Sequence, residues 1–155
     1  MRSTVFLTVG TTPFDRLVEA VHTSLRPDLF DVVYQISEHA RYIPEASTWF
    51  AFDPEIDRYY DAADLIICHA GAGTVFAVLE RSHRCVVCPN LSRRDKHQEQ
   101  LAAWIQSNNY AEVCANPRYI ATHVENALSN KNTYSRYVPD PFVGYDAIRN
   151  ALGIR

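Results

Sequence analysis

The feature that most constrains the fold is a strand, a glycine turn and a helix that follow one another over residues 64–80. Leu65–Cys68 is a short apolar run, β-branched at its centre, which is typical of a strand covered on both faces. Gly71 and Gly73 then allow positive φ angles and a close approach of a ligand to the backbone. The apolar run that begins at Thr74 predicts a helix whose free N–H groups face the turn and favour a bound phosphate. The alternative is that the glycines make a purely structural turn.

A second glycine turn is predicted near the N-terminus. Residues 4–9 are apolar and β-branched, as in a strand, and residues 14–25 carry apolar side chains at helical spacing. Gly10, Thr11 and Thr12 lie between them, so their N–H groups and hydroxyls could face an anion. In the competing interpretation, Thr11 or Thr12 simply caps the helix.

The rest of the chain alternates strand-like and helix-like patterns. Further strands are predicted at 31–37, 49–52, 84–88 and 110–114, and further helices at 54–63, 97–105, 117–128 and 146–152. This alternation predicts one α/β domain over 1–155, with a Rossmann-like parallel sheet, helices on both faces, and a C-terminal tail and helix over 130–155. Loops after parallel strands open on one edge, so the polar clusters at 10–12, 35–37, 69–74 and 90–98 are expected to meet there.

Charge and hydrophobicity exclude some classes of protein. The net charge is −3 without a basic block, which argues against nucleic acid as the main partner. No apolar run approaches the length of about 20 residues that spans a bilayer, and the first residues lack a signal-peptide pattern, so we expect a cytoplasmic chain.

The four cysteines all lie in apolar runs, and two of them, Cys85 and Cys88, have the spacing of a redox or zinc motif. On a strand, however, residues three apart point to opposite faces. We therefore expect reduced, buried thiols rather than a metal site, and we predict no cofactor.

Several separated motifs together resemble family 28 glycosyltransferases. They are residues 9–15, residues 63–74, Glu80, and the pair His97 and Gln98. The resemblance covers roughly residues 3–115 and implies the C-terminal, nucleotide-sugar-binding half of a two-domain GT-B fold. A chain of this size is similar to the soluble subunit of split enzymes, either the N-acetylglucosaminyltransferase of lipid-linked N-glycan assembly or bacterial capsule and exopolysaccharide enzymes.

The resemblance implies a set of substrate-binding residues and no catalytic residue in this chain. Residues 10–12 and the stretch Gly71, Ala72, Gly73 and Thr74 would face the diphosphate of a UDP-sugar from two sides. Glu80 would hold the ribose hydroxyls, His97 and Gln98 would read the sugar, and Phe52 would lie near the uracil. Ser37 stands where the family often has glycine, and the loop over 90–95 lacks a glycine that is common in relatives.

The resemblance also implies a division of labour. Inverting transfer needs a base beside the acceptor hydroxyl, and this base would belong to a membrane-anchored partner subunit that binds a lipid-linked acceptor. The donor would be UDP-N-acetylglucosamine or another UDP-hexose, and the partner would bring this chain to the membrane. The apolar residues of 137–154 could grip that partner or pack on their own domain. The other readings are a non-catalytic nucleotide-binding regulatory module and a sugar-nucleotide epimerase-like fragment.

Overall fold

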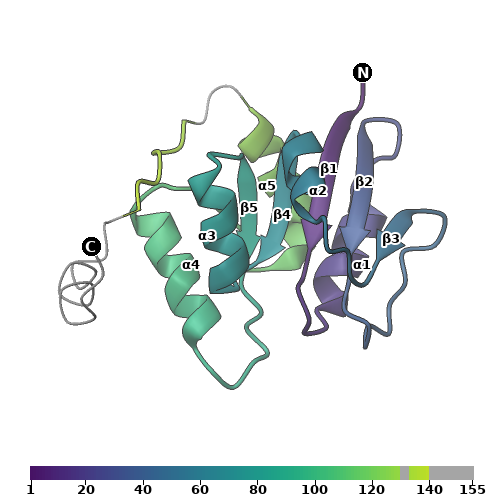
Figure 1. The fold of residues 1–155 in the computed structure, drawn as a ribbon, viewed down its shortest axis with the longest axis horizontal. Helices are drawn as coiled ribbons and strands as arrows, with labels where there is room; N and C mark the ends of the chain where they lie inside the picture. The colour runs from purple at the N-terminus through teal and green to yellow at the C-terminus, as the bar shows by residue number, and fades with distance from the viewer. Residues whose placement is uncertain (130–132, 140–155) are drawn as a thin grey trace, which may run out of the picture.

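The computed structural model describes residues 1–129 and 133–139, and these residues form a six-stranded parallel sheet with helices on both faces (Figure 1). The strands are β1 (Ser3–Thr8), β2 (Phe30–Gln35), β3 (Thr48–Phe50), β4 (Leu65–His69), β5 (Cys85–Cys88) and β6 (Glu112–Val113). The helices are α1 (Asp15–Ser24), α2 (Asp57–Ala62), α3 (Ala72–Glu80), α4 (His97–Ser107) and α5 (Ile120–Leu128). The predicted α/β class and Rossmann-like layout are confirmed.

The strand order is β3-β2-β1-β4-β5-β6, so the chain reverses its direction of winding between β1 and β4. Such a switch point leaves a crevice at the carboxyl ends of the two central strands, where open α/β sheets bind their ligands. All the strands run the same way, and the loops that leave them lie along one edge of the sheet (Figure 1). The topology therefore brings the β1–α1, β4–α3 and β5–α4 loops to one edge.

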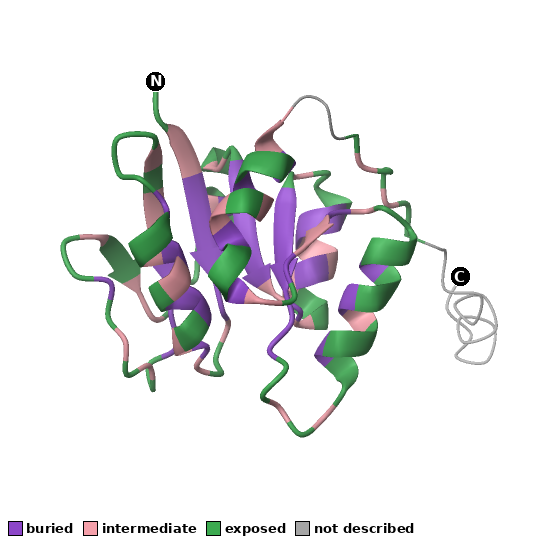
Figure 2. Ribbon diagram, turned by 180° about the vertical axis from the view of Figure 1, so that it is seen from behind, coloured by how far each residue is buried: buried purple, intermediate pink, exposed green. Residues whose placement is uncertain are grey.

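Two apolar layers hold the helices against the sheet, and Figure 2 shows the buried strands between them. One layer joins α1 and α5 to one face of the sheet, and the other joins α2, α3 and α4 to the opposite face. Successive strand residues alternate between the layers: Ile66 and Cys68 belong to one, Leu65 and Ile67 to the other. This alternation follows from the period of two along a strand and explains why β4 is apolar without interruption.

The cysteines behave as the strand geometry predicts. Cys85 packs in the layer under α3 and α4, whereas Cys88 packs in the layer under α1 and α5. All four thiols are free and buried, and burial raises the pKa of Cys85 to about 12. The expected burial of the thiols and the opposite orientation of Cys85 and Cys88 are confirmed.

Several element boundaries differ from the prediction, and three of the differences change the character of the element. The helix predicted over 54–63 begins only at Asp57, because the Asp53 carboxylate first accepts the Glu55 N–H in a local turn. The helix predicted over 117–128 opens with a 3-10 turn, Pro117–Tyr119, whose cap is the side chain of Asn116. The last predicted strand is reduced to the two residues of β6.

The segment 133–139 runs back over its own domain. Ser135 N–H donates to the Asn109 carbonyl (2.7 Å), and Tyr134 donates to Glu112 (2.8 Å). The ring of Tyr137 packs against Trp104 and other aromatic side chains of α3 and the α4–β6 loop. Of the candidate partner-binding tail, Tyr137 is thus docked on this domain, Val138 is exposed, and the predicted helix over 146–152 lies outside the described residues. No helix among the described residues is long and apolar enough to cross a membrane.

Candidate functional site

A pocket of about 350 Å³ opens at the switch point, where the loops after β1, β4 and β5 meet. Hollows of similar volume occur elsewhere on the described surface, but this one lies where the topology predicts a ligand. Its lining comes from the three loops and the first residues of α3 and α4: Thr11, Thr12, His69, Ala70, Gly71, Ala72, Arg93, Asp95, His97 and Gln98. Six of the ten predicted site residues line the pocket, namely Thr11, Thr12, Gly71, Ala72, His97 and Gln98.

The turn after β1 is held from within the protein. Gly10 has a φ of +68°, a conformation that favours glycine. The buried Gln35 side chain accepts from the Gly10 N–H (2.9 Å) and donates to the Gly10 carbonyl (3.0 Å). The Ser37 hydroxyl donates to the Thr11 carbonyl (2.7 Å). The polar cluster predicted at 35–37 therefore shapes the Gly10 turn, and these hydrogen bonds occupy its side chains.

Thr11 and Thr12 do not cap α1. The N-cap of that helix is Phe14, whose side chain makes no capping hydrogen bond. Both threonines are exposed and line the pocket. The capping alternative is thus wrong for both residues, and their side chains remain on the ligand side of the loop.

The imidazole of His69 fills the space between the two glycine turns. A Cβ added at Gly71 would lie 2.1 Å from His69 Nε2, and one added at Gly10 would lie 3.0 Å from Cε1. The glycine turn in the sequence predicts a positive φ angle at Gly71. This prediction is wrong, since the φ of Gly71 is −81°. Glycine is needed at 71 because the histidine ring approaches it closely, a reason that no local pattern reveals.

His69 is favoured in its neutral form. Burial lowers its pKa and the charge of Arg93 lowers it further, although a backbone group of Thr8 partly opposes the shift. Its Nδ1 is buried and has no partner with hydrogen-bond geometry among the described residues. The ring therefore lines the pocket as a neutral group with one unsatisfied nitrogen.

The N-terminus of α3 faces the pocket without a side-chain cap. Its N-cap is Gly71, and Ala72 and Gly73 are exposed. Gly73 lies within the helix, so the positive φ expected there is wrong as well, and a Cβ at this position would meet nothing within 4 Å. Burial raises the pKa of the Tyr60 phenol, and the neighbouring Thr74 side chain partly opposes that shift. The backbone N–H of Thr74 lies in the first turn of the helix, where such groups have no intrahelical partner and can face a ligand.

Glu80 is not brought to the pocket. It is the exposed last residue of α3, about 12 Å along the helix axis from Ala72 at 1.5 Å per residue. The ribose role stays a prediction, and it requires the nucleotide to extend along α3 away from the pocket.

The loop between β5 and α4 supplies the remaining wall. His97 is exposed, whereas Gln98 is buried and its carbonyl oxygen accepts from the Asn90 N–H (2.9 Å). Arg93 and Asp95 form an ion pair in this wall (2.9 Å). Sequence reasoning missed both residues; the available signal was a charged pair directly ahead of a helix that follows a central strand.

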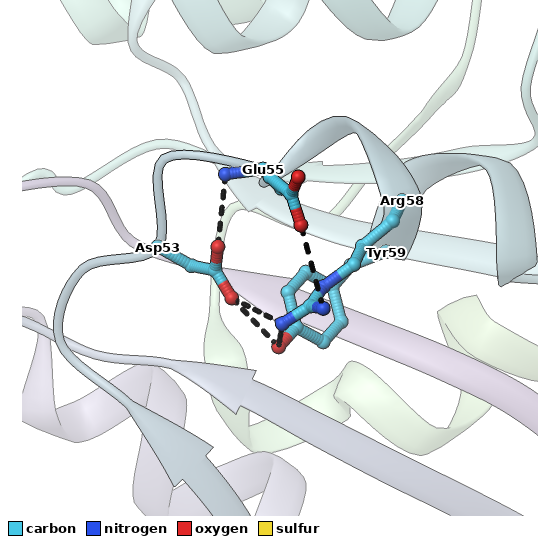
Figure 3. Close-up of polar contacts among 4 residues, drawn as sticks. All are labelled: Asp53, Glu55, Arg58 and Tyr59. Atoms are coloured by element: carbon cyan, nitrogen blue, oxygen red, sulfur yellow. Dashed lines mark hydrogen bonds and ion pairs between the residues drawn. The ribbon is translucent and has the colours of Figure 1, made fainter.

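The segment after β3 reaches the same edge of the sheet. Phe52 is 83% exposed there, and the carbonyl of its neighbour Ala51 accepts from Gln35, the side chain that holds the Gly10 turn. Asp53 accepts from Arg58 (2.6 Å) and Tyr59 (3.0 Å), as Figure 3 shows. These contacts fix the turn that presents Phe52, whose predicted position near a uracil remains untested. Within the described residues, no cluster of His, Cys, Asp and Glu could hold a metal ion.

The doubly wound parallel sheet, with a pocket at its switch point, defines a Rossmann-like α/β domain. Residues 4–138 match the glycosyltransferase family 28 C-terminal domain, and the chain belongs to this family.

Two curated relatives are similar in sequence to this chain. The chain is 30% identical over 125 residues to human UDP-N-acetylglucosamine transferase subunit ALG13, a match that covers 71% of this chain and 11% of that protein. The mouse protein of the same name is 30% identical over 122 residues, covering 70% of this chain and 10% of its own length. The chain thus spans about a tenth of these relatives.

Solved structures share the fold. The NMR structure of an ALG13 protein superposes with a TM-score of 0.61 at 20% identity, over 97% of this chain and 94% of that one. The crystal structure of MurG from Acinetobacter baumannii gives 0.66 at 18% identity, over 99% of this chain and 53% of MurG. The predicted likeness to one half of a GT-B glycosyltransferase is confirmed.

Proposed function

We propose that this chain is the donor-binding subunit of a two-component inverting hexosyltransferase that uses a UDP-sugar. The observation that carries the proposal is the meeting of two glycine turns at the switch point, with an uncapped helix N-terminus between them. Free N–H groups and a helix dipole stabilise a diphosphate, both in the bound donor and as the departing group. Membership of a glycosyltransferase family and relatives named UDP-N-acetylglucosamine transferase subunits support this choice of ligand.

In this proposal the whole chain acts as a single nucleotide-sugar-binding domain. The diphosphate lies between residues 10–12 and the first turn of α3, His97 and Gln98 face the sugar, and Glu80 remains the candidate for the ribose. Gln98 suits its role because its carbonyl oxygen is already held by Asn90, which fixes the side chain and leaves the amide N–H groups as donors. Binding the donor in one orientation is the contribution to catalysis.

The second half of the enzyme would come from a partner. We propose a membrane-anchored subunit that binds a lipid-linked acceptor and supplies the base, because the groups that line the described pocket suit a donor diphosphate and the family resemblance implies an acceptor site in the other half of the fold. The pathway is glycan or polysaccharide synthesis, and this chain would lie on the cytoplasmic side of the membrane through its partner. UDP-N-acetylglucosamine is the first donor to test because the relatives are named as transferase subunits for this sugar.

A transfer assay tests this function. We expect radiolabel to move from UDP-N-acetylglucosamine to a lipid-linked acceptor when the chain is combined with membranes that contain the partner subunit, and neither component to be active alone. Other UDP-hexoses serve as parallel donors. Robust transfer by the isolated chain would contradict the split-enzyme proposal. UDP binding without transfer in the reconstituted pair would instead favour the regulatory module.

A further inference from the structure

One arginine reaches across the pocket from the β5–α4 loop. Among the described residues that line the pocket, Arg93 carries the only arginine or lysine side chain. Its Nε lies 2.9 Å from Asp95 Oδ2, and its Nη1 lies 3.4 Å from Thr12 Oγ1 on the opposite loop. The guanidinium is therefore held at one end and only loosely engaged at the other.

Asp95 holds this arginine in place. The Asp95 carboxylate accepts from Arg93, which is the main reason its pKa lies below the usual value, and the His97 backbone at the start of α4 lowers the pKa further. A carboxylate near a helix N-terminus is stabilised in its charged form, so it remains a partner for the side chain it binds. Asp95 is thus a positioning residue that aims the guanidinium over the pocket.

The Arg93 guanidinium has more N–H donors than its described contacts use. It carries five N–H groups in a fork that matches phosphate oxygens, and the described contacts engage Nε and Nη1. The contact with Thr12 is at the upper limit of hydrogen-bond distance, so a charged acceptor would replace it readily. The neighbouring His69 is held neutral, which leaves Arg93 as the permanent positive charge of this wall.

We propose that Arg93 binds the diphosphate of the nucleotide donor, exchanging its contact with Thr12 for phosphate oxygens while Asp95 retains Nε. The inference rests on the proposed function, and it adds a cationic side chain to a site otherwise built from backbone N–H groups. Thr12 and the N-terminus of α3 would face the same diphosphate from the other sides. The ligand class is a nucleoside diphosphate or its sugar conjugate.

The test compares UDP with uridine in titrations of the full-length chain. We expect Arg93→Gln to weaken UDP binding by about tenfold to a hundredfold, the scale of one or two charge-assisted hydrogen bonds, and to leave uridine binding unchanged. Arg93→Lys should restore part of the UDP affinity. Added salt should weaken UDP binding more in the wild type than in Arg93→Gln.

Arg94→Gln is the matched control, because Arg94 is exposed, adjacent in the same loop and outside the pocket lining. We expect it to change UDP affinity by less than about twofold. If Arg93→Gln binds UDP as tightly as the wild type, or if Arg93→Gln and Arg94→Gln lose UDP affinity equally, the role of Arg93 is overturned. The proposed function would stand in either case. Failure of the wild type to bind UDP would overturn both.

Discussion

Replacing Gly71 by alanine is expected to lower the free energy of unfolding by about 1–3 kcal/mol, the usual cost of overpacking. The new Cβ would lie 2.1 Å from His69 Nε2, a distance no packed structure tolerates. The backbone itself would not resist alanine, because Gly71 has the extended angles φ −81° and ψ 128°. The collision with the ring is therefore the whole reason for the loss, which chemical denaturation would measure.

A double-mutant cycle measures how much of the lost stability comes from the contact between the new Cβ and the His69 ring. In the background of His69→Ala, the ring is gone and Gly71→Ala should cost less than about 0.5 kcal/mol. Gly73→Ala serves as the matched glycine control, since a Cβ there meets nothing within 4 Å. Gly71→Ala with wild-type stability, or an equal loss in both backgrounds, would contradict the packing explanation.

At Gly73, in contrast to Gly71, a substitution is expected to lower the affinity for UDP and to leave the stability nearly unchanged. Gly73→Val should weaken UDP binding about tenfold or more, because the side chain would project from the first turn of α3 into space that we assign to the diphosphate. Stability should stay within about 1 kcal/mol of the wild type, since glycine is among the poorest residues within a helix. Calorimetric titration and thermal unfolding of the same samples separate the two effects.

Gly73→Ala should give a smaller loss of affinity together with equal or higher stability. Ala103→Val, at an exposed position of α4 outside the pocket lining, controls for a valine on a helix surface. Parallel losses of stability and affinity in Gly73→Val would support the interpretation of residues 71–74 as a structural turn and count against a phosphate site.

Much of the fold follows from short-range patterns. The apolar period of Leu17, Val18 and Val21 predicts α1, and the uninterrupted run of β4 predicts a strand buried on both faces, because helical and strand periods reflect which side chains meet the sheet. The shared edge of the loops follows from the parallel direction of the strands.

Local patterns do not show how the backbone brings side chains together, even between near neighbours. His69 is only two residues before Gly71, yet the sequence does not distinguish a glycine required by positive φ from one required by that ring. Other missed features depend on contacts between distant residues. Arg93 acquires its place only when the β5–α4 loop meets Thr12, 81 residues earlier in the chain. The polar pair Gln35 and Ser37 was correctly placed at the ligand edge, but its hydrogen bonds are made to the neighbouring loop.

The position of the segment 133–139 could not be predicted from local sequence patterns either. Its sequence has weak periodicity, and its position comes from hydrogen bonds to Asn109 and Glu112 and from aromatic packing of Tyr137. These contacts leave Val138 exposed at the end of a docked segment. Any partner-binding role of the tail is therefore expected to begin at or after this residue.

A UDP titration followed by backbone amide NMR tests the central claim most directly. We expect saturable binding of the full-length chain, with the largest shifts at the amides of Thr11, Thr12, Ala72, Gly73 and Thr74. We expect little change in the segment 133–139, which contacts Asn109, Glu112 and Trp104 and does not line the pocket. Absence of binding at millimolar UDP even with the partner present, or shifts confined to a different surface, would contradict the assignment of this pocket as the donor site.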